Sequence, residues 1–152
     1  MEGVARRAGV ATGTLYVYHK SKEALLDAAY SATKRQIADA VFREEGLPVR
    51  PAFLGMCVAY LEFLVAHRAE VAFLEQLHHS TLLSPSTRAA AESGARPLVE
   101  LLERGKRELL LKDLETPLII AFLQATLREM AKTAPKARFP QIALLCWDAL
   151  RA

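Results

Sequence analysis

Residues 3–29 read GVARRAGVATGTLYVYHKSKEALLDAA, and this stretch governs how the rest of the chain is interpreted. Gly9 separates a short helix predicted over residues 2–8 from a second one predicted over residues 12–19. Glycine accepts the left-handed backbone that ends a helix, and Val10 can fill the space between the two helices. Two short helices around such a turn are typical of a helix-turn-helix, whose second helix enters the major groove of DNA.

Further residues at fixed spacing make this pattern more specific than a lone turn. Ala8-Gly9-Val10 is followed by Gly13-Thr14-Leu15-Tyr16, by Tyr18 and by Ser21-Lys22-Glu23-Ala24-Leu25-Leu26. The compound pattern resembles the N-terminal region of TetR-family regulators over roughly residues 2–30. This resemblance implies an all-α homodimer with a helix-turn-helix followed by a helical bundle for effector binding and dimerisation. It also implies a transcriptional regulator, usually a repressor that a small molecule releases from its double-stranded DNA operator.

The resemblance also implies which residues contact DNA. Base-proximal positions lie at the start of the second helix, and backbone contacts follow them. The implied set is Ala11, Thr12, Gly13, Thr14, Tyr16, Tyr18, His19, Lys20 and Lys22. A phenol can donate a hydrogen bond to a phosphate oxygen, and a lysine adds positive charge. Leu15 is expected in the core instead, and Tyr18 fits a core position equally well.

Three features depart from the family pattern. Ala11 stands where serine is more common, so the second helix loses a cap that Thr12 could supply one residue later. His19 stands where phenylalanine is more common. The family's first helix, which would precede Met1, is not in the sequence, so we expect the segment before Lys22 to be loosely held. The alternative function is therefore a helical dimeric ligand- or partner-binding protein with impaired DNA binding.

The excess positive charge lies at the start of the chain. The formal net charge is +3, and residues 1–22 hold four basic residues and one acidic residue. Of the totals of 20 basic and 17 acidic residues, 16 of each therefore remain in the other 130 positions. Charge placed this way can meet phosphates, with Arg6 and Arg7 as weaker candidates.

Apolar spacing predicts further helices and no strands. They cover residues 22–44, 52–66, 70–79, 87–110, 117–132 and 141–151. Ser21 and Thr116 are the predicted N-caps of the first and fifth of these helices. Gly94 and Pro97 are expected to kink or break the fourth. We divide the chain into a DNA-binding and connecting segment, 1–44, and an effector-binding and dimerisation domain, 45–152.

The helix predicted over residues 52–66 is apolar on all sides and should be enclosed by the others. It is shorter than the ~20 residues that a membrane-spanning helix needs. No signal peptide opens the sequence, so we expect a cytoplasmic protein without a membrane partner. Cys57 and Cys146 lie in apolar stretches, which favours buried thiols over a disulfide.

Mostly apolar side chains with a few polar groups suggest a small-molecule site between the helices over 52–66 and 70–79. The candidates are Met56, Cys57, Tyr60, Phe63, Phe73, Leu74, Leu77 and His78. This lining suits an apolar or aromatic effector, although a solid core explains the same residues equally well. His67, His78 and His79 lack the spacing of a metal site, so we expect neither a metal nor another cofactor.

The last two predicted helices carry more large apolar residues than one chain can readily bury. The candidate dimer contacts are Leu118, Phe122, Leu144 and Trp147. A symmetric four-helix arrangement between two subunits would cover them, as the family resemblance implies.

An enzyme is disfavoured by what the sequence lacks. It contains no nucleophile and base at a recognisable spacing and no Gly-rich phosphate loop. It also contains no paired-carboxylate pattern and no HExxH. The sequence therefore favours a binding protein over a catalyst.

Overall fold

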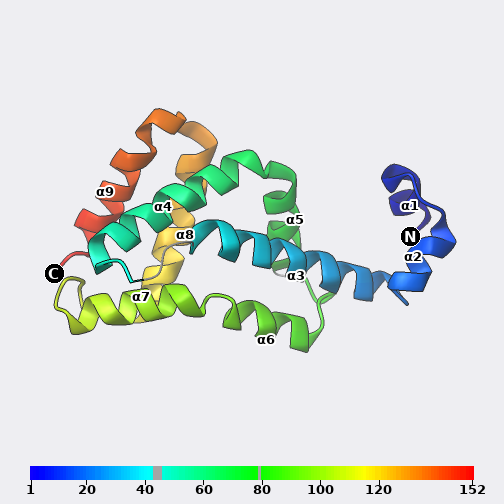
Figure 1. The fold of residues 1–152 in the computed structure, drawn as a ribbon, viewed down its shortest axis with the longest axis horizontal. Coiled ribbons are helices and arrows are strands. Elements are labelled where there is room, and N and C mark those ends of the chain that lie inside the picture. Colours follow the sequence, from blue (N-terminus) through cyan, green and yellow to red (C-terminus); the bar gives the residue numbers. More distant parts are fainter. Residues whose placement is uncertain (43–45, 79) are drawn as a thin grey trace.

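A computed structural model describes residues 1–42, 46–78 and 80–152. Within these ranges the chain forms α-helices and a short 3₁₀ helix without β-strands, which confirms the predicted all-α class (Figure 1). The elements are α1 Glu2–Ala8, α2 Thr12–Tyr18, α3 Lys22–Val41, α4 Val49–Ala66, α5 Arg68–His78, α6 Pro85–Ser93, α7 Arg96–Arg107, α8 Thr116–Thr133, η1 Lys136–Arg138 and α9 Phe139–Leu150. Positions 43, 44 and 79, at the ends of two predicted helices, lie outside the described residues.

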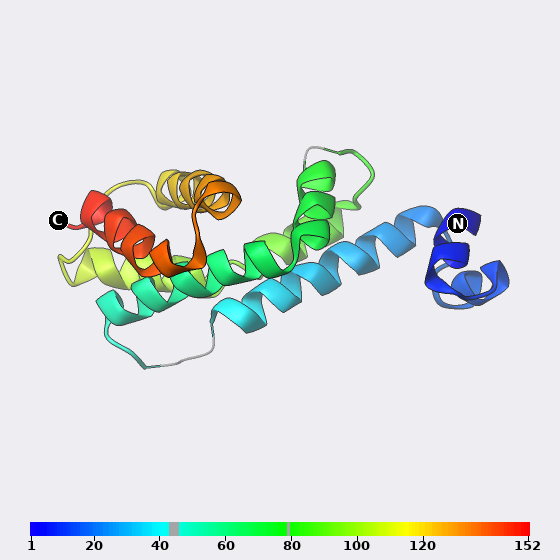
Figure 2. The ribbon, with the colours of Figure 1, turned by 90° about the horizontal axis from the view of Figure 1, so that it is seen from above.

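The molecule is elongated, with its two ends formed by different parts of the sequence. Helices α1 and α2 lie at one end, and α9 lies at the other with the C-terminus (Figures 1 and 2). Helix α3 leads from α2 into the body, where it packs against α4, α5 and α6. One continuous helix therefore joins the N-terminal pair to the helical bundle.

Helix α4 is the central element of the bundle and contacts α3, α7, α8 and α9. Its side chains Phe53, Cys57 and Leu61 are completely buried. Within the described residues it is also the helix that is long and apolar enough to cross a membrane by length and composition. Its central position accounts for this apolar sequence, and the prediction that the helix is enclosed by others is confirmed.

The predicted helix over 87–110 is broken into α6 and α7, as the sequence suggested. Gly94 follows the end of α6, and Pro97 lies in the first turn of α7. Proline fits there because the first amides of a helix have no partner within the helix. The predicted cap of α3 is also confirmed, since the Ser21 hydroxyl accepts a hydrogen bond from the Ala24 amide over 3.1 Å.

The predicted capping role of Thr116 is wrong. Glu115 holds the N-cap position of α8 without a side-chain hydrogen bond, and Thr116 is already helical. The Thr116 hydroxyl instead accepts a hydrogen bond from the Lys106 ammonium over 2.7 Å and donates one to the Glu103 carboxylate. Thr116 thus links α8 to α7, a contact that local sequence does not reveal.

Gly105 in α7 provides a test of packing around α4. A Cβ atom at this position would lie 2.6 Å from Leu111 Cδ1 and 3.1 Å from Val49 Cγ1, both in buried side chains. We expect Gly105→Ala to destabilise the fold by about 1–3 kcal/mol, because the overpacking outweighs the gain in helix propensity. Chemical denaturation measures this change. Gly55→Ala is the matched control, since a Cβ atom there would meet nothing within 4 Å apart from its chain neighbours and its own helix backbone, and the helix should gain stability. Equal gains in both variants would contradict the packing argument.

Candidate functional site

Gly9 ends α1 in the left-handed conformation, with φ 69° and ψ 25°. Its amide donates to the carbonyl oxygens of Ala5 and Arg6, and the Val10 amide donates to Ala5 over 3.0 Å. These bonds satisfy the last carbonyl groups of α1 and direct the chain into α2. The predicted turn at Gly9 is confirmed. Val10, however, is 40% exposed and does not fill the space between the helices, whereas Ala5 of α1 is buried.

Helix α2 begins without a side-chain cap. Ala11 holds the N-cap position, and Thr12 is the first helical residue and not a replacement cap, so that prediction is wrong. The helix ends at Tyr18, one residue earlier than predicted, and the His19 amide donates to the Leu15 carbonyl over 2.8 Å. Leu15 is half-buried, not fully enclosed as expected.

The side chains predicted to meet DNA lie mostly on the surface. Tyr18 is 77% exposed and Tyr16 is 50% exposed, so the core alternative for Tyr18 is wrong. Ala11, Gly13, Thr14, Lys20 and Lys22 are also exposed, whereas Thr12 and His19 are half-buried. In the fully described segment 1–29, Ala5 is the one buried residue. The helix-turn-helix therefore presents nearly all of its side chains outward.

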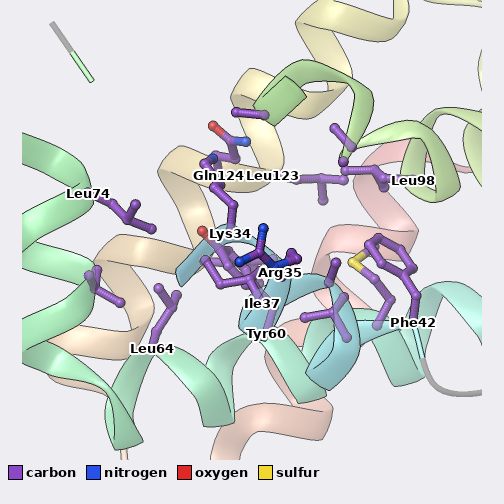
Figure 3. Close-up of a pocket in the computed structure, with 18 of the residues that line it drawn as sticks. Lys34, Arg35, Ile37, Phe42, Tyr60, Leu64, Leu74, Leu98, Leu123 and Gln124 are labelled. Carbon is purple, nitrogen blue, oxygen red and sulfur yellow. The ribbon is translucent and has the colours of Figure 1, made fainter. Parts of the chain in front are cut away.

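A second feature is a cavity of about 240 Å³ inside the bundle, partly open to solvent. Helices α3, α4, α5, α6, α7 and α8 all contribute to its lining. Figure 3 shows Lys34, Arg35 and Gln124 near its middle, with Leu64 and Leu74 on one side and Leu98 and Phe42 on the other. The cavity therefore combines apolar walls with a small polar group of side chains.

Solved structures share this architecture over nearly the whole chain. A TetR family transcription regulator from Marinobacter aquaeolei VT8 is 23% identical, with a TM-score of 0.88 over 97% of this chain and 82% of that one. A protein from Shewanella sp. PV-4, proposed to be a tetR family transcription regulator, is 25% identical, with a TM-score of 0.78 over 98% and 85%. The fatty acid degradation regulator FadR from Bacillus halodurans is 20% identical, with a TM-score of 0.71 over 99% and 88%. No curated protein matches the sequence significantly.

The N-terminal sequence provides the deciding observation. Residues 1–29 match the family model of the bacterial regulatory proteins of the tetR family. The N-terminal segment of this chain is that of a tetR-family bacterial regulatory protein. The matched residues form α1, α2 and the start of α3, so the match lies on the helix-turn-helix around Gly9. The family is one of transcription regulators and is not an enzyme class.

The cavity of the regulator includes some of the predicted ligand-binding residues and excludes others. Met56, Tyr60 and Leu74 line it. Cys57, Phe63, Phe73 and Leu77 lie outside it, and their role in ligand binding stays a prediction. Each of the four packs elsewhere: Cys57 inside the main core, Phe63 on the His67 ring, and Phe73 and Leu77 in a second core cluster with Tyr30. The side chain of His78 lies outside the described part of the structure.

Both cysteines are buried and free, as predicted. A hydrogen bond to Cys146 and burial raise the pKa of the Cys57 thiol well above its ordinary value. Because the thiolate is the reactive form of cysteine, Cys57 is an inert part of the core.

Sequence reasoning missed the polar residues of the cavity. Lys34 and Arg35 come from α3, and Gln124 and Arg128 come from α8. Each looks like an ordinary residue on the polar face of an amphipathic helix, and nothing in the local sequence marks it. Burial lowers the pKa of Lys34, and the nearby positive charge of Arg128 lowers it further.

Asp27 connects the regulator's long helix to another wall of the cavity. Its carboxylate accepts a hydrogen bond from the Ser84 amide over 3.0 Å, and Ser84 is the N-cap of α6. Ser84 also accepts a hydrogen bond from the Thr87 amide over 3.2 Å. Burial alone would raise the pKa of Asp27, but hydrogen bonds from Ser84 and Thr87 outweigh it and lower the pKa below its ordinary value of 3.8.

We expect the contact between Asp27 and Ser84 to depend on pH. Because the folded-state pKa is lowered, its contribution is complete above pH 3.8 and is lost as the pH falls through the lower folded value. The Ser84 amide shift in an NMR pH titration reports this loss. Asp27→Asn keeps a hydrogen-bond acceptor without the titrating charge, and its Ser84 shift should stay nearly constant; an unchanged transition would assign the titration to another group.

Helices α8 and α9 leave large apolar side chains exposed. Leu118 is 58%, Phe122 38%, Leu144 38% and Leu145 68% exposed. Three of these four were predicted as dimer contacts, and their exposure leaves them available to a partner. Leu118 and Phe122 are four residues apart and thus lie on one face of α8.

Trp147 was also predicted at the dimer interface, and this prediction is wrong. Only 5% of the residue is exposed, because the indole packs inward against α4. Its ring meets Phe53 edge to face at 5.4 Å, and the Arg50 guanidinium lies 6.0 Å from its centre. Trp147 therefore belongs to the core of its own subunit.

Proposed function

We propose that this regulator binds a double-stranded DNA operator as a homodimer and acts as a repressor released by a small apolar or aromatic effector. The position of α3 carries the proposal. Lys22, its first residue, directly follows the helix-turn-helix, and its second half lines the cavity through Lys34, Ile37 and Val41. A ligand that moves the second half of α3 would therefore also move α1 and α2.

The operator contacts in this proposal are the residues that the family resemblance assigned. Ala11, Thr12, Gly13 and Thr14 meet base edges, and Tyr16, Tyr18, His19, Lys20 and Lys22 meet the DNA backbone. The exposure of all of these residues except the half-buried Thr12 and His19, and the positive charge of residues 1–22, support this assignment. An operator-binding protein of this kind acts in the cytoplasm, without a membrane partner.

The homodimer in this proposal forms through α8 and α9. Exposed apolar side chains on both helices support it, since such a face gains stability when a second copy covers it. Leu118, Phe122 and Leu144 remain proposed contacts, and Leu145 joins them. A dimer would place two helix-turn-helix units at a fixed separation, as a two-fold operator requires.

Binding to the DNA that flanks its own gene tests the proposal. Fluorescence anisotropy between 50 and 200 mM salt should show affinity that falls steeply with salt, because phosphate contacts release counterions. The double variant Lys20→Gln/Lys22→Gln should lower the salt slope by about two, and Tyr16→Phe/Tyr18→Phe should weaken binding with less effect on the slope. Arg107→Gln, an exposed basic residue at the end of α7, is the matched control and should change neither quantity.

The alternative function is a helical dimeric ligand- or partner-binding protein with impaired DNA binding. The sparse packing of the N-terminal pair favours it, since Ala5 is the one buried residue of the described segment 1–29. A helix-turn-helix with little core of its own is held weakly in a DNA-binding geometry. Absence of salt-dependent binding at every concentration of the dimer would favour this alternative.

A further inference from the structure

We infer that the cavity between α3 and α8 takes an anionic amphiphile, meaning a molecule with an apolar body and one acidic head group. The inference rests on the proposed function, because it assumes that the effector binds in this cavity. It goes further by naming the chemical class and the side chains that select it.

The first argument is the balance of charge in the cavity. Lys34, Arg35 and Arg128 line it, and none of its other described lining residues is acidic. In the described part of the chain, none of these three forms an ion pair with a carboxylate. The Lys34 ammonium nitrogen lies over the ring of Tyr30, 5.6 Å from its centre. Lys34 and Arg128 are partly buried, and no carboxylate in the described part of the chain forms an ion pair with either of them.

The second argument is an unsatisfied donor. Nε of Arg128 is buried and has no hydrogen-bond partner among the described groups. A buried donor without a partner is costly and uncommon in folded proteins. A carboxylate or phosphate at this position could accept from the guanidinium and from Lys34 in charge-assisted hydrogen bonds. An alcohol would lack the negative charge that balances these two groups.

The third argument is the remaining wall of the cavity. Met56, Leu64, Leu74, Leu98 and Leu123 contribute apolar surface around the polar group, as Figure 3 shows for the four leucines. The volume of about 240 Å³ exceeds the roughly 150 Å³ of an apolar cavity that holds benzene. The space suits an apolar body on the order of ten carbon atoms.

The position of Arg128 indicates where the head group lies. Arg128 also lines an adjoining cavity of about 200 Å³, together with Leu64 and Val71. The other charged residues there are Arg68, Lys132 and Glu75, so its lining carries excess positive charge. The acidic head group should therefore point toward Arg128, with the apolar body directed toward α4 and α7.

Calorimetry with three ligands of equal chain length tests this class on the whole chain, at concentrations below micelle formation. The ligands are decanoate, decyl phosphate and the neutral 1-decanol. We expect one or both anions to bind about 10- to 100-fold more tightly than decanol, as hydrogen bonds between charged groups imply. Tighter binding of only one anion identifies the head group and supports the inference. Equal or tighter binding of decanol overturns it.

Variants then test the assigned side chains. Arg128→Met and Lys34→Met keep an apolar stem and remove the charge, so each should reduce the preference for the anion and leave decanol binding nearly unchanged. Lys34→Arg retains the charge and should retain the preference, which separates a lost charge from a damaged fold. Arg107→Met is the matched control outside the cavity. An unchanged preference in folded Arg128→Met and Lys34→Met would overturn the assignment.

The same measurements separate this inference from the proposed function. If decanol binds as well as the anions and weakens operator binding, only the anionic class is wrong. If none of the three ligands binds the cavity while the operator is still bound, the inference is wrong and DNA binding is retained.

Discussion

The double variant Leu118→Glu/Phe122→Glu should be a monomer of 16.8 kDa under conditions in which the unmodified regulator has twice that mass. Both side chains lie on one face of α8 and are exposed in the single subunit. Their replacement places charges at the proposed two-fold contact, where each must lose water and meet the same charge from the other copy. Light scattering at micromolar concentration measures the mass.

Loss of the dimer should weaken operator binding by about 10²–10⁴-fold, because the second half-site no longer binds intramolecularly. Leu82→Glu is the matched control, an exposed apolar residue between α5 and α6 that is 45% exposed. It should leave both mass and operator affinity unchanged. A 16.8 kDa particle for the unmodified chain would exclude the proposed dimer.

Trp147→Ala should cause a larger loss of stability than Gly105→Ala or Asp148→Ala. Replacing a buried tryptophan by alanine removes apolar burial and leaves a cavity, at a cost of about 3–5 kcal/mol. The edge-to-face contact with Phe53 at 5.4 Å adds to the loss. For a chain of this length the melting temperature should fall by roughly 6–20 °C. Circular dichroism in the helical band measures the change without relying on the indole itself.

Two comparisons make this result specific. Asp148→Ala changes the next residue of α9 and breaks only an exposed pair with Arg151 at 3.5 Å, so it should cost less than about 1 kcal/mol. Trp147→Phe keeps most of the buried apolar surface, so its melting temperature should lie between those of Trp147→Ala and Asp148→Ala. A melting temperature of Trp147→Ala close to that of Asp148→Ala would contradict the placement of Trp147 in the core.

The local elements followed from short-range rules. Gly9 ended α1 because glycine accepts a positive φ, and Ser21 capped α3 because its hydroxyl reaches an amide three residues ahead. The break near Gly94 and Pro97 and the enclosed α4 were likewise readable from residue type and apolar spacing. Each of these features depends on residues that are close together in the sequence.

Other features were decided by contacts between distant parts of the chain. Trp147 and Leu144 look alike in an apolar helix, and the side that α9 presents to α4 determines that one is buried and the other exposed. Thr116 was predicted to cap α8, but its hydroxyl forms hydrogen bonds with Lys106 and Glu103 of α7 instead. Lys34 and Arg128 line the same cavity because α3 and α8 both pack on α4. The spacing of residues within either helix does not predict that these two side chains lie near each other.

The helices, the turn at Gly9 and the resemblance of residues 1–29 to the tetR family could be read from the order of the amino acids. Backbone conformation, capping and apolar spacing depend on residues that are close together, so they can be predicted from a short segment of sequence. The identity of the buried apolar faces and of the charged side chains that share a cavity became clear from the folded chain, because both depend on how helices far apart in the sequence pack together.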